Sequence, residues 1–135
     1  MKTQMLSKLI LLGIAFFYAS IVFAQHSTPW NVPRSAKEKK NLYSPDEPSL
    51  SRGQKSYKIE CLRCHGKEGK GDGSSAMKIK KTVADLTSDY VQNQTDGELF
   101  WKISEGRSPM PLAKHILTDD QRWDVINYIR TFKKK

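Results

Sequence analysis

Cysteine is scarce in this sequence, and the 135 residues include only Cys61 and Cys64. A structural zinc site needs four ligands, which usually come from two ligand pairs. Here the single pair and the adjacent His65 supply three ligands at most. The lack of a second pair therefore argues against a structural zinc site.

Alternating runs of β-branched residues, the usual pattern of strands, are also missing, so we expect an all-α fold. Three capping-box patterns predict where helices begin. They are Ser51 with Gln54, Thr95 with Glu98, and Thr118 with Gln121. The predicted helices cover residues 51–64, 95–105 and 118–132, with a shorter one near 88–93.

Acidic residues are few, since 14 Asp and Glu stand against 23 Lys and Arg. None occurs in residues 1–24, which carry two lysines and then an apolar run from Leu9 to Ala24. This pattern is typical of a secretory signal peptide, so we expect cleavage after Ala24 and an exported, periplasmic protein. A retained membrane anchor is the weaker interpretation, because the apolar run is short and no charged stop follows it.

The mature chain would carry 21 basic and 14 acidic residues, a formal charge of +7. Nucleic acid is a poor partner for an exported protein, and no groove-reading motif accompanies the charge. We expect the charge to steer the protein toward redox partners with acidic docking surfaces, or toward peripheral contact with an anionic membrane. The alternative is a solvated basic face that only maintains solubility.

Residues 25–48 contain four of the six prolines and no sustained periodicity, so we expect an extended arm or linker there. Trp30 is an exception in this segment, because a large aromatic side chain could pin the arm onto the domain. The predicted organisation is thus a signal peptide (1–24), an arm (25–48) and one domain (49–135).

Cys61, Cys64 and His65 form a CxxCH motif within the stretch "IECLRCHGKEGKGDG". A disulfide between these cysteines would need a thioredoxin-like setting, in which the pair follows a strand and not a helical pattern. CxxCH is also the signature of covalent heme attachment. Positions i and i+3 face one side of a helix, so both thiols can reach the porphyrin while His65 reaches the iron. We therefore predict one covalent heme c.

From residue 49 to 133 the chain resembles a class I, single-heme bacterial cytochrome c domain. The resemblance rests on "RGQKSYKIECLRCHG", with Gly53 and Tyr57 before the attachment site, on "HGKEGKGDG", on "SPMP" and on the final "LTDDQRWDVINYIRTF". It implies a small all-α fold of three to four helices around one covalently bound heme. It also implies that the last helix crosses the first near Gly53, with an aromatic side chain such as Tyr128 beside the crossing.

Met110, in "GRSPMPLAKH", lies where the family places its second axial ligand, and Pro109 and Pro111 stiffen this loop. The resemblance therefore implies that His65 and Met110 are the two ligands of the heme iron. The weaker candidates for the second ligand are Met77, His26 and His115. A His/Met pair closes the iron to small molecules and raises its reduction potential, which suits an electron carrier and not an enzyme.

Apolar residues are also expected to line the heme crevice and exclude water from it. The candidates are Leu86, Phe100, Ile103 and Leu112. Many relatives have a proline after the heme histidine whose carbonyl accepts the ring N–H, but here no proline occurs between His65 and Pro109. We expect a backbone carbonyl of the glycine-rich loop (65–86) to take that role, because a ligating histidine nearly always has such an acceptor.

These features leave three candidate functions. The first is a periplasmic electron carrier, a monomer whose lysine-ringed heme edge docks on an acidic partner. The candidate docking lysines are Lys55, Lys58, Lys67, Lys70, Lys78, Lys80, Lys81 and Lys114. The second is a heme c subunit of a larger periplasmic oxidoreductase complex, tethered by residues 25–48. The third is a gas- or peroxide-binding heme protein, for which the sequence offers no obvious catalytic base.

Overall fold

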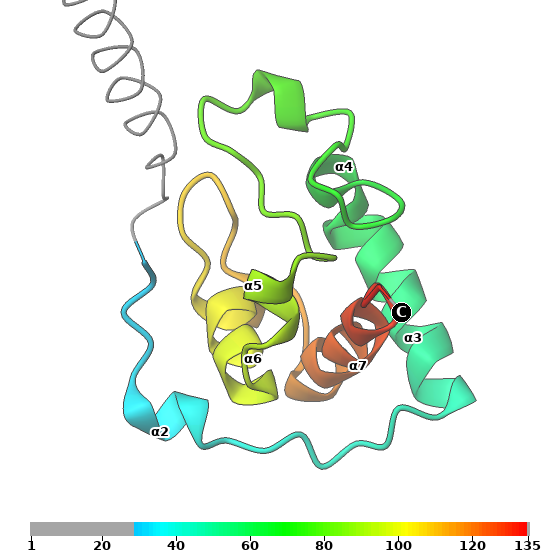
Figure 1. Cartoon of the computed structure of the whole chain (residues 1–135). Helices are drawn as coiled ribbons and strands as arrows, with labels where there is room; N and C mark the ends of the chain where they lie inside the picture. Colours follow the sequence, from blue (N-terminus) through cyan, green and yellow to red (C-terminus); the bar gives the residue numbers. More distant parts are fainter. Residues whose placement is uncertain (1–28, 135) are drawn as a thin grey trace, which may run out of the picture.

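The structure of the protein is a computed structural model that describes residues 29–134. In this part of the chain all regular elements are helical and no strand is present. In chain order they are α2 (Arg34–Lys37), α3 (Glu47–Glu60), α4 (Leu62–His65), the 3-10 turn η1 (Ala76–Lys78), α5 (Asp89–Gln92), α6 (Asp96–Glu105), the 3-10 turn η2 (Ala113–His115) and α7 (Asp119–Arg130). The all-α prediction is confirmed, and α3, α6 and α7 form the body of the fold (Figure 1).

Two of the three predicted capping boxes are confirmed. The hydroxyl of Thr95 accepts from the N–H of Glu98, whose carboxylate accepts from the N–H of Thr95, at the start of α6. Thr118 and Gln121 exchange the same two bonds at the start of α7. Each box satisfies backbone N–H groups that have no partner within the helix.

The third predicted box, at Ser51, is wrong, because α3 already begins at Glu47. Its N-cap is Asp46, whose carboxylate accepts from the N–H of Ser49 at 3.0 Å. Pro48 lies in the first turn, where a helix needs no N–H from that residue. The helix therefore takes in the last two residues of the expected arm.

The close crossing of α3 and α7 organises the fold. At Gly53 a Cβ atom would lie 2.0 Å from the carbonyl oxygen of Asp124, so only glycine lets the two backbones approach this far. Tyr57, which is 1% exposed, packs beside the crossing against the rings of Tyr128 and Phe132, with centroid distances of 5.4 and 5.3 Å. The crossing and the aromatic side chain that the resemblance implies are both present.

A buried polar network ties the two helices together next to this crossing. The Asp124 carboxylate, 2% exposed, accepts from the hydroxyl of Ser49 at 2.6 Å and from the Arg52 guanidinium at 2.7 and 3.0 Å. The amide of Asn127 donates to the same Ser49 hydroxyl at 2.9 Å. The buried carboxylate is therefore satisfied by donors that all come from α3.

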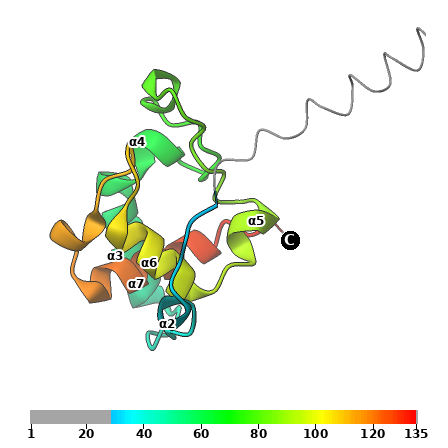
Figure 2. The same cartoon turned by 90° about the vertical axis from the view of Figure 1, so that its left-hand side faces the viewer.

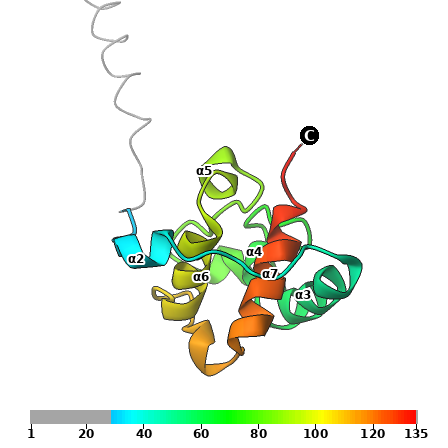
Figure 3. The same cartoon turned by 90° about the horizontal axis from the view of Figure 1, so that it is seen from below.

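Residues 29–46 cross beneath α6 and α7 and lead to the start of α3 (Figures 1 and 3). Asn41 donates its side-chain amide to the Asn127 side chain at 2.8 Å, and Tyr43 donates its hydroxyl to Asp120 at 2.6 Å. The prediction that Trp30 pins the arm is confirmed by its edge contact with Trp101. The described part of the arm is therefore packed on the helices.

The remaining long connection, between α4 and α5, projects furthest from the helical body (Figures 1 and 2). It carries η1 at its tip, where Met77 is 98% exposed. In the described range 29–134, no helix is both long enough and apolar enough to cross a membrane. The predicted signal peptide and His26 lie outside the described residues.

Candidate functional site

The two cysteines lie at the junction of α3 and α4. Cys61 caps the C-terminus of α3, and its carbonyl accepts from the N–H groups of Cys64 at 3.1 Å and His65 at 2.9 Å. These bonds close one helical turn, which places side chains three and four positions apart on the same side. The thiols are not joined to each other. Both are therefore available, on one face, to the same group.

The protonation of Cys61 separates this pair from a redox dithiol. Burial, with smaller contributions from the Glu60 carboxylate and Cys64, raises the pKa of the Cys61 thiol to about 12. Redox-active cysteines instead have lowered pKa values, because their thiolate attacks the disulfide. The shift at Cys61 is thus opposite in direction to that of a redox-active cysteine.

His65 is oriented by a backbone carbonyl far along the chain. Its Nδ1 lies 3.1 Å from the carbonyl oxygen of Ala84, and because a carbonyl only accepts, the proton is on Nδ1. The other nitrogen, Nε2, then carries the lone pair that a metal requires. Burial lowers the pKa of His65, and the bond to Ala84 acts in the opposite direction. Ala84 belongs to the loop 65–86, so the expected source of the acceptor is confirmed.

The glycines of this loop bring Ala84 to His65. Gly71 donates its N–H to the His65 carbonyl at 2.8 Å, and the Gly69 carbonyl accepts from Leu86 at 2.6 Å. Gly71 has φ +77°, and a Cβ there would lie 2.6 Å from the carbonyl oxygen of Val83. Since L-residues rarely adopt this φ and would also collide, glycine is required for the loop to fold back beside His65.

Met110 lies in a tight turn between α6 and η2. Arg107 and Met110 exchange two backbone hydrogen bonds, of 3.1 and 2.9 Å, and the Ser108–Pro109 peptide bond between them is cis. Gly106 ends α6 with φ +59°, and a Cβ there would lie 2.4 Å from the Pro111 carbonyl oxygen. The Met110 side chain is half-buried and packs against the core.

The other candidates for the second ligand are placed differently. Met77 is almost fully exposed at the tip of the projecting loop, and His115 is exposed on η2. Among the expected crevice residues Leu86, Phe100 and Ile103 are buried in the core, whereas Leu112 is 45% exposed. The role of Leu86 and Leu112 as walls of the crevice stays a prediction.

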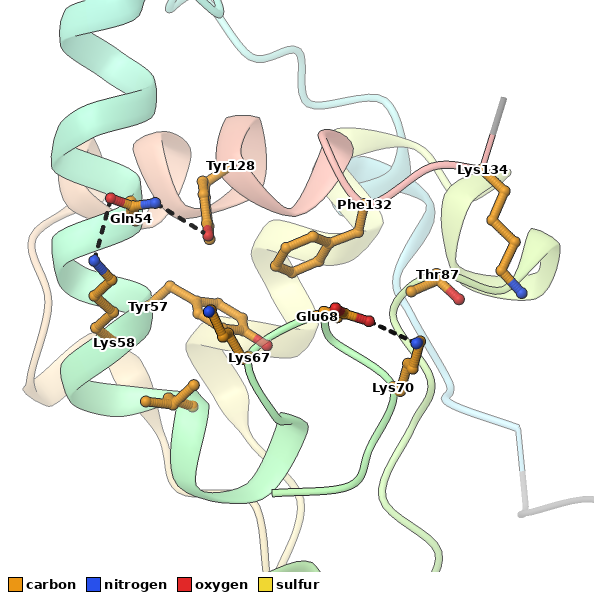
Figure 4. A pocket seen from close by; sticks show the side chains of 11 residues that line it. Gln54, Tyr57, Lys58, Lys67, Glu68, Lys70, Thr87, Tyr128, Phe132 and Lys134 are labelled. Carbon is orange, nitrogen blue, oxygen red and sulfur yellow. Dashed lines mark hydrogen bonds and ion pairs between the residues drawn. The ribbon is translucent and has the colours of Figure 1, made fainter. Parts of the chain in front are cut away.

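An open groove lies beside the attachment site (Figure 4). The rings of Tyr57, Tyr128 and Phe132 lie along it, and Glu68 and Lys70 form an ion pair at its edge (Figure 4). Leu62 lines it as well, but neither cysteine, His65 nor Met110 does. The groove is therefore lined by residues other than the predicted heme ligands.

The donor set fits a c-type heme and little else. Two thiols and one imidazole come from a single helical turn, and the imidazole has its free nitrogen on Nε2. Within the described residues, no cluster of three or more His, Cys, Asp and Glu side chains could hold a bare metal ion. The comparison with protein families agrees, because the model of the cytochrome c family matches residues 50–133.

The chain belongs to the cytochrome c family. As a cytochrome c domain it is expected to bind heme c covalently and to serve heme-based electron transfer. No curated protein shows significant similarity to the chain.

Solved structures include a similar fold in a chain of the reducing HAO-like protein complex of Kuenenia stuttgartiensis. The two share 29% sequence identity with a TM-score of 0.61, over 68% of this cytochrome c chain and 47% of the other. The similarity thus spans about half of the length of that chain, and it supports the fold.

Sequence reasoning found the heme-binding motif but not the contacts that hold it in place. Ala84 acts through its backbone carbonyl, which every residue possesses, so its side chain carries no signal. The contact of Trp30 with the Met110 turn, described below, joins residues far apart in the sequence. A proline at position 84 would have been the one sequence signal for the acceptor, because the family uses one.

Proposed function

We propose that this cytochrome c is an exported, periplasmic electron carrier that holds one heme c with His65 and Met110 as axial ligands. The observation that carries the proposal is the turn of Met110, which is fixed by two backbone hydrogen bonds and presents a half-buried thioether. The single CxxCH motif supports one heme. When bound, the heme supplies a one-electron ferric–ferrous couple, and two protein ligands leave the iron no open position.

The protein's own residues suit this role because they limit rearrangement. His65 is held by Ala84, and Met110 is held by Arg107, so both ligands are positioned by backbone bonds and not by mobile side chains. A site that changes little with oxidation state passes an electron with little reorganisation.

The ligand assignment is tested by the absorption spectra of the heme-loaded Met110→Ala variant, with Met77→Ala as the matched control. Met110→Ala is expected to lose the methionine-to-iron charge-transfer band of the ferric protein and to bind carbon monoxide readily when reduced. Met77→Ala removes the same side chain from an almost fully exposed site and is expected to leave both properties unchanged. Loss of the band in Met77→Ala but not in Met110→Ala would overturn the assignment and favour Met77 as the ligand.

Docking on an acidic redox partner is part of the proposal and rests on charge. The expected net charge of +7 would attract an acidic surface over about a Debye length, and the attraction would weaken as salt is added. Four of the candidate lysines already have partners. Lys70 pairs with Glu68, Lys114 pairs with Glu105, Lys81 donates to the Ser108 carbonyl and Lys58 donates to the Gln54 side chain. The exposed Lys55, Lys67, Lys78 and Lys80 remain the candidates for docking.

Small-molecule oxidants of opposite charge test whether the protein's positive charge governs docking. Electron transfer from the reduced protein to an anionic hexacyanoferrate complex should slow as ionic strength rises, whereas transfer to a cationic cobalt complex should accelerate. Equal salt responses for the two oxidants would remove the docking proposal and leave the charge as a determinant of solubility.

A second candidate is a heme c subunit of a larger redox complex. The similarity to part of a chain of the HAO-like complex favours it. The described part of the arm, residues 29–46, packs on α6 and α7, and the tether role stays a prediction. Stable co-purification with a partner from native periplasm would favour the subunit, and elution at the mass of a monomer would favour the free carrier.

A further inference from the structure

Trp30, in the N-terminal arm, contacts the turn that carries Met110. The guanidinium carbon of Arg107 lies 4.3 Å from the centroid of the Trp30 ring, within the range of a cation–π contact. The edge of Trp101 on α6 supports the same ring, with centroids 6.0 Å apart and planes at 83°. Trp30 is half-buried, so the contact is partly shielded from water. The arm and the Met110 turn are thus joined through one arginine.

The backbone of Arg107 is what positions Met110. The two residues exchange both N–H···O=C bonds of an isolated antiparallel bridge, so a displacement of Arg107 displaces Met110 with it. Gly106, with φ +59° and its backbone against Pro111, closes the base of the same turn. A contact that restrains the side chain of Arg107 therefore also restrains the turn.

The arm itself is fixed to α6, so Trp30 can restrain the side chain of Arg107. Val32 is 8% exposed, and the Lys37 carbonyl accepts from the hydroxyl of Thr95 at 2.9 Å. At Gly97 a Cβ would lie 2.0 Å from the carbonyl oxygen of Ala36, so α6 provides a gap into which the arm backbone fits. Trp30 therefore extends from a segment that is fixed to α6.

We propose that Trp30 is a positioning residue for the axial methionine: by holding Arg107 it keeps the 107–110 turn in the arrangement that directs Met110 toward the iron. The inference rests on the proposed ligation by Met110 and deepens it. A small external ligand that competes with Met110 then binds only when the turn opens, and its apparent affinity is reduced by the fraction of protein in the open state. Loss of the Trp30 contact raises that fraction.

The test is a titration of the ferric, heme-loaded protein with imidazole. Trp30→Ala is expected to tighten the apparent imidazole affinity by roughly fivefold, the change that corresponds to an ordinary cation–π contact. Trp30→Phe retains an aromatic face for Arg107 and should recover most of the original affinity. Tyr43→Phe loosens the other end of the arm, at Asp120, and should leave imidazole affinity unchanged. An equal tightening in Tyr43→Phe, or none in Trp30→Ala, overturns the inference.

A double-mutant cycle separates this inference from the ligation on which it rests. If Met110 is the ligand, Met110→Ala alone tightens imidazole binding, and Trp30→Ala then has no further effect in that background. If Met110→Ala changes neither the spectrum nor the affinity, the proposed ligation fails. If Met110→Ala behaves as expected while Trp30→Ala has the same effect with and without the methionine, the ligation stands and the positioning role fails.

Discussion

The ring of His65 and the carbonyl of Ala84 lie 3.1 Å apart across 19 positions of the chain. This bond assigns the proton to Nδ1 and makes the imidazole a better donor of electrons through Nε2, because a polarised N–H increases ligand basicity. A more basic ligand favours ferric iron. The loop that carries Ala84 therefore bears on the reduction potential of the heme site.

Gly71→Ala is expected to raise the reduction potential. A Cβ at residue 71 would collide with the carbonyl of Val83 and displace the adjacent Ala84 from His65. If the lost hydrogen bond favours ferric iron by about 1 kcal/mol, the potential rises by roughly 40 mV for a one-electron couple. Spectroelectrochemical titration of the heme-loaded protein measures this shift.

Gly69→Ala is the matched control for this shift. Gly69 also has a positive φ, of +75°, so the backbone strain is similar. Its Cβ would meet the ring of Phe132 and not the carbonyls of residues 83 and 84. The control should lose stability and shift the potential less than Gly71→Ala does, because its added Cβ meets the side chains of Phe132 and Leu86. Equal shifts in both variants would show that loop strain, and not the His65 acceptor, sets the potential.

Arg52→Met should lower the unfolding free energy more than the loss of a surface ion pair does, because it leaves the buried Asp124 carboxylate with fewer donors. Arg34→Met is the control. Its ion pair with Glu38 has side-chain exposures of 92% and 63%, and such surface pairs contribute about 0.5 kcal/mol or less. Denaturant unfolding of the two heme-loaded variants should separate them clearly, and equal losses would contradict the role of the network.

Gly53→Ala should destabilise the protein by about 3 kcal/mol or more. The added Cβ would lie 2.0 Å from a backbone oxygen of α7, which cannot rotate away as a side chain can, so the helices have to separate. Gln54→Ala changes the next residue, which is exposed on α3, and serves as the control. The midpoint of thermal unfolding measures both, and a wild-type midpoint for Gly53→Ala would show that the crossing is not tight.

Local signals predicted local structure well. The boxes at Thr95 and Thr118 lie wholly within four consecutive residues, so their geometry is encoded where it is used. The start of α3 was missed because Asp46 competes with Ser51 for the same role, and Pro48 favours the earlier start. The sequence contains both patterns, and in the structure Asp46 is the N-cap.

Long-range contacts could not be predicted in the same way. The hydrogen bond from His65 to Ala84 uses a backbone carbonyl, which every residue possesses. Trp30 and Arg107 are far apart in the sequence, and no local pattern joins them. Leu112 is 45% exposed, and its predicted place in a crevice wall stays a prediction. The CxxCH motif thus predicted the chemistry of the site. The contacts that position its residues depend on how the loops fold back.

The free energy of unfolding should decrease as the pH is lowered, in part because Asp85 becomes protonated. Asp85 follows Ala84, whose carbonyl accepts from His65. The hydroxyl of Thr87 donates to its carboxylate at 2.7 Å and the Thr87 N–H at 2.8 Å, and these bonds hold the pKa of Asp85 below its usual value of 3.8, with the hydroxyl contributing most. A carboxyl with a lowered folded-state pKa stabilises the fold above its unfolded pKa, and this contribution is lost as the pH falls through the folded value.

Thr87→Val removes the hydroxyl donor and should cost about 1.5 kcal/mol at pH 7, because the bond is to a charged acceptor. The difference from wild type should shrink as the pH falls below about 4, since the protonated carboxyl is a weaker acceptor. Thr131→Val removes a hydroxyl that donates to the uncharged carbonyl of Tyr128 at 2.7 Å, so its cost should not vary with pH. Denaturant unfolding at pH 7 and pH 3 compares the two variants. A cost for Thr87→Val that stays constant down to pH 3 would place the stabilising charge elsewhere in the loop.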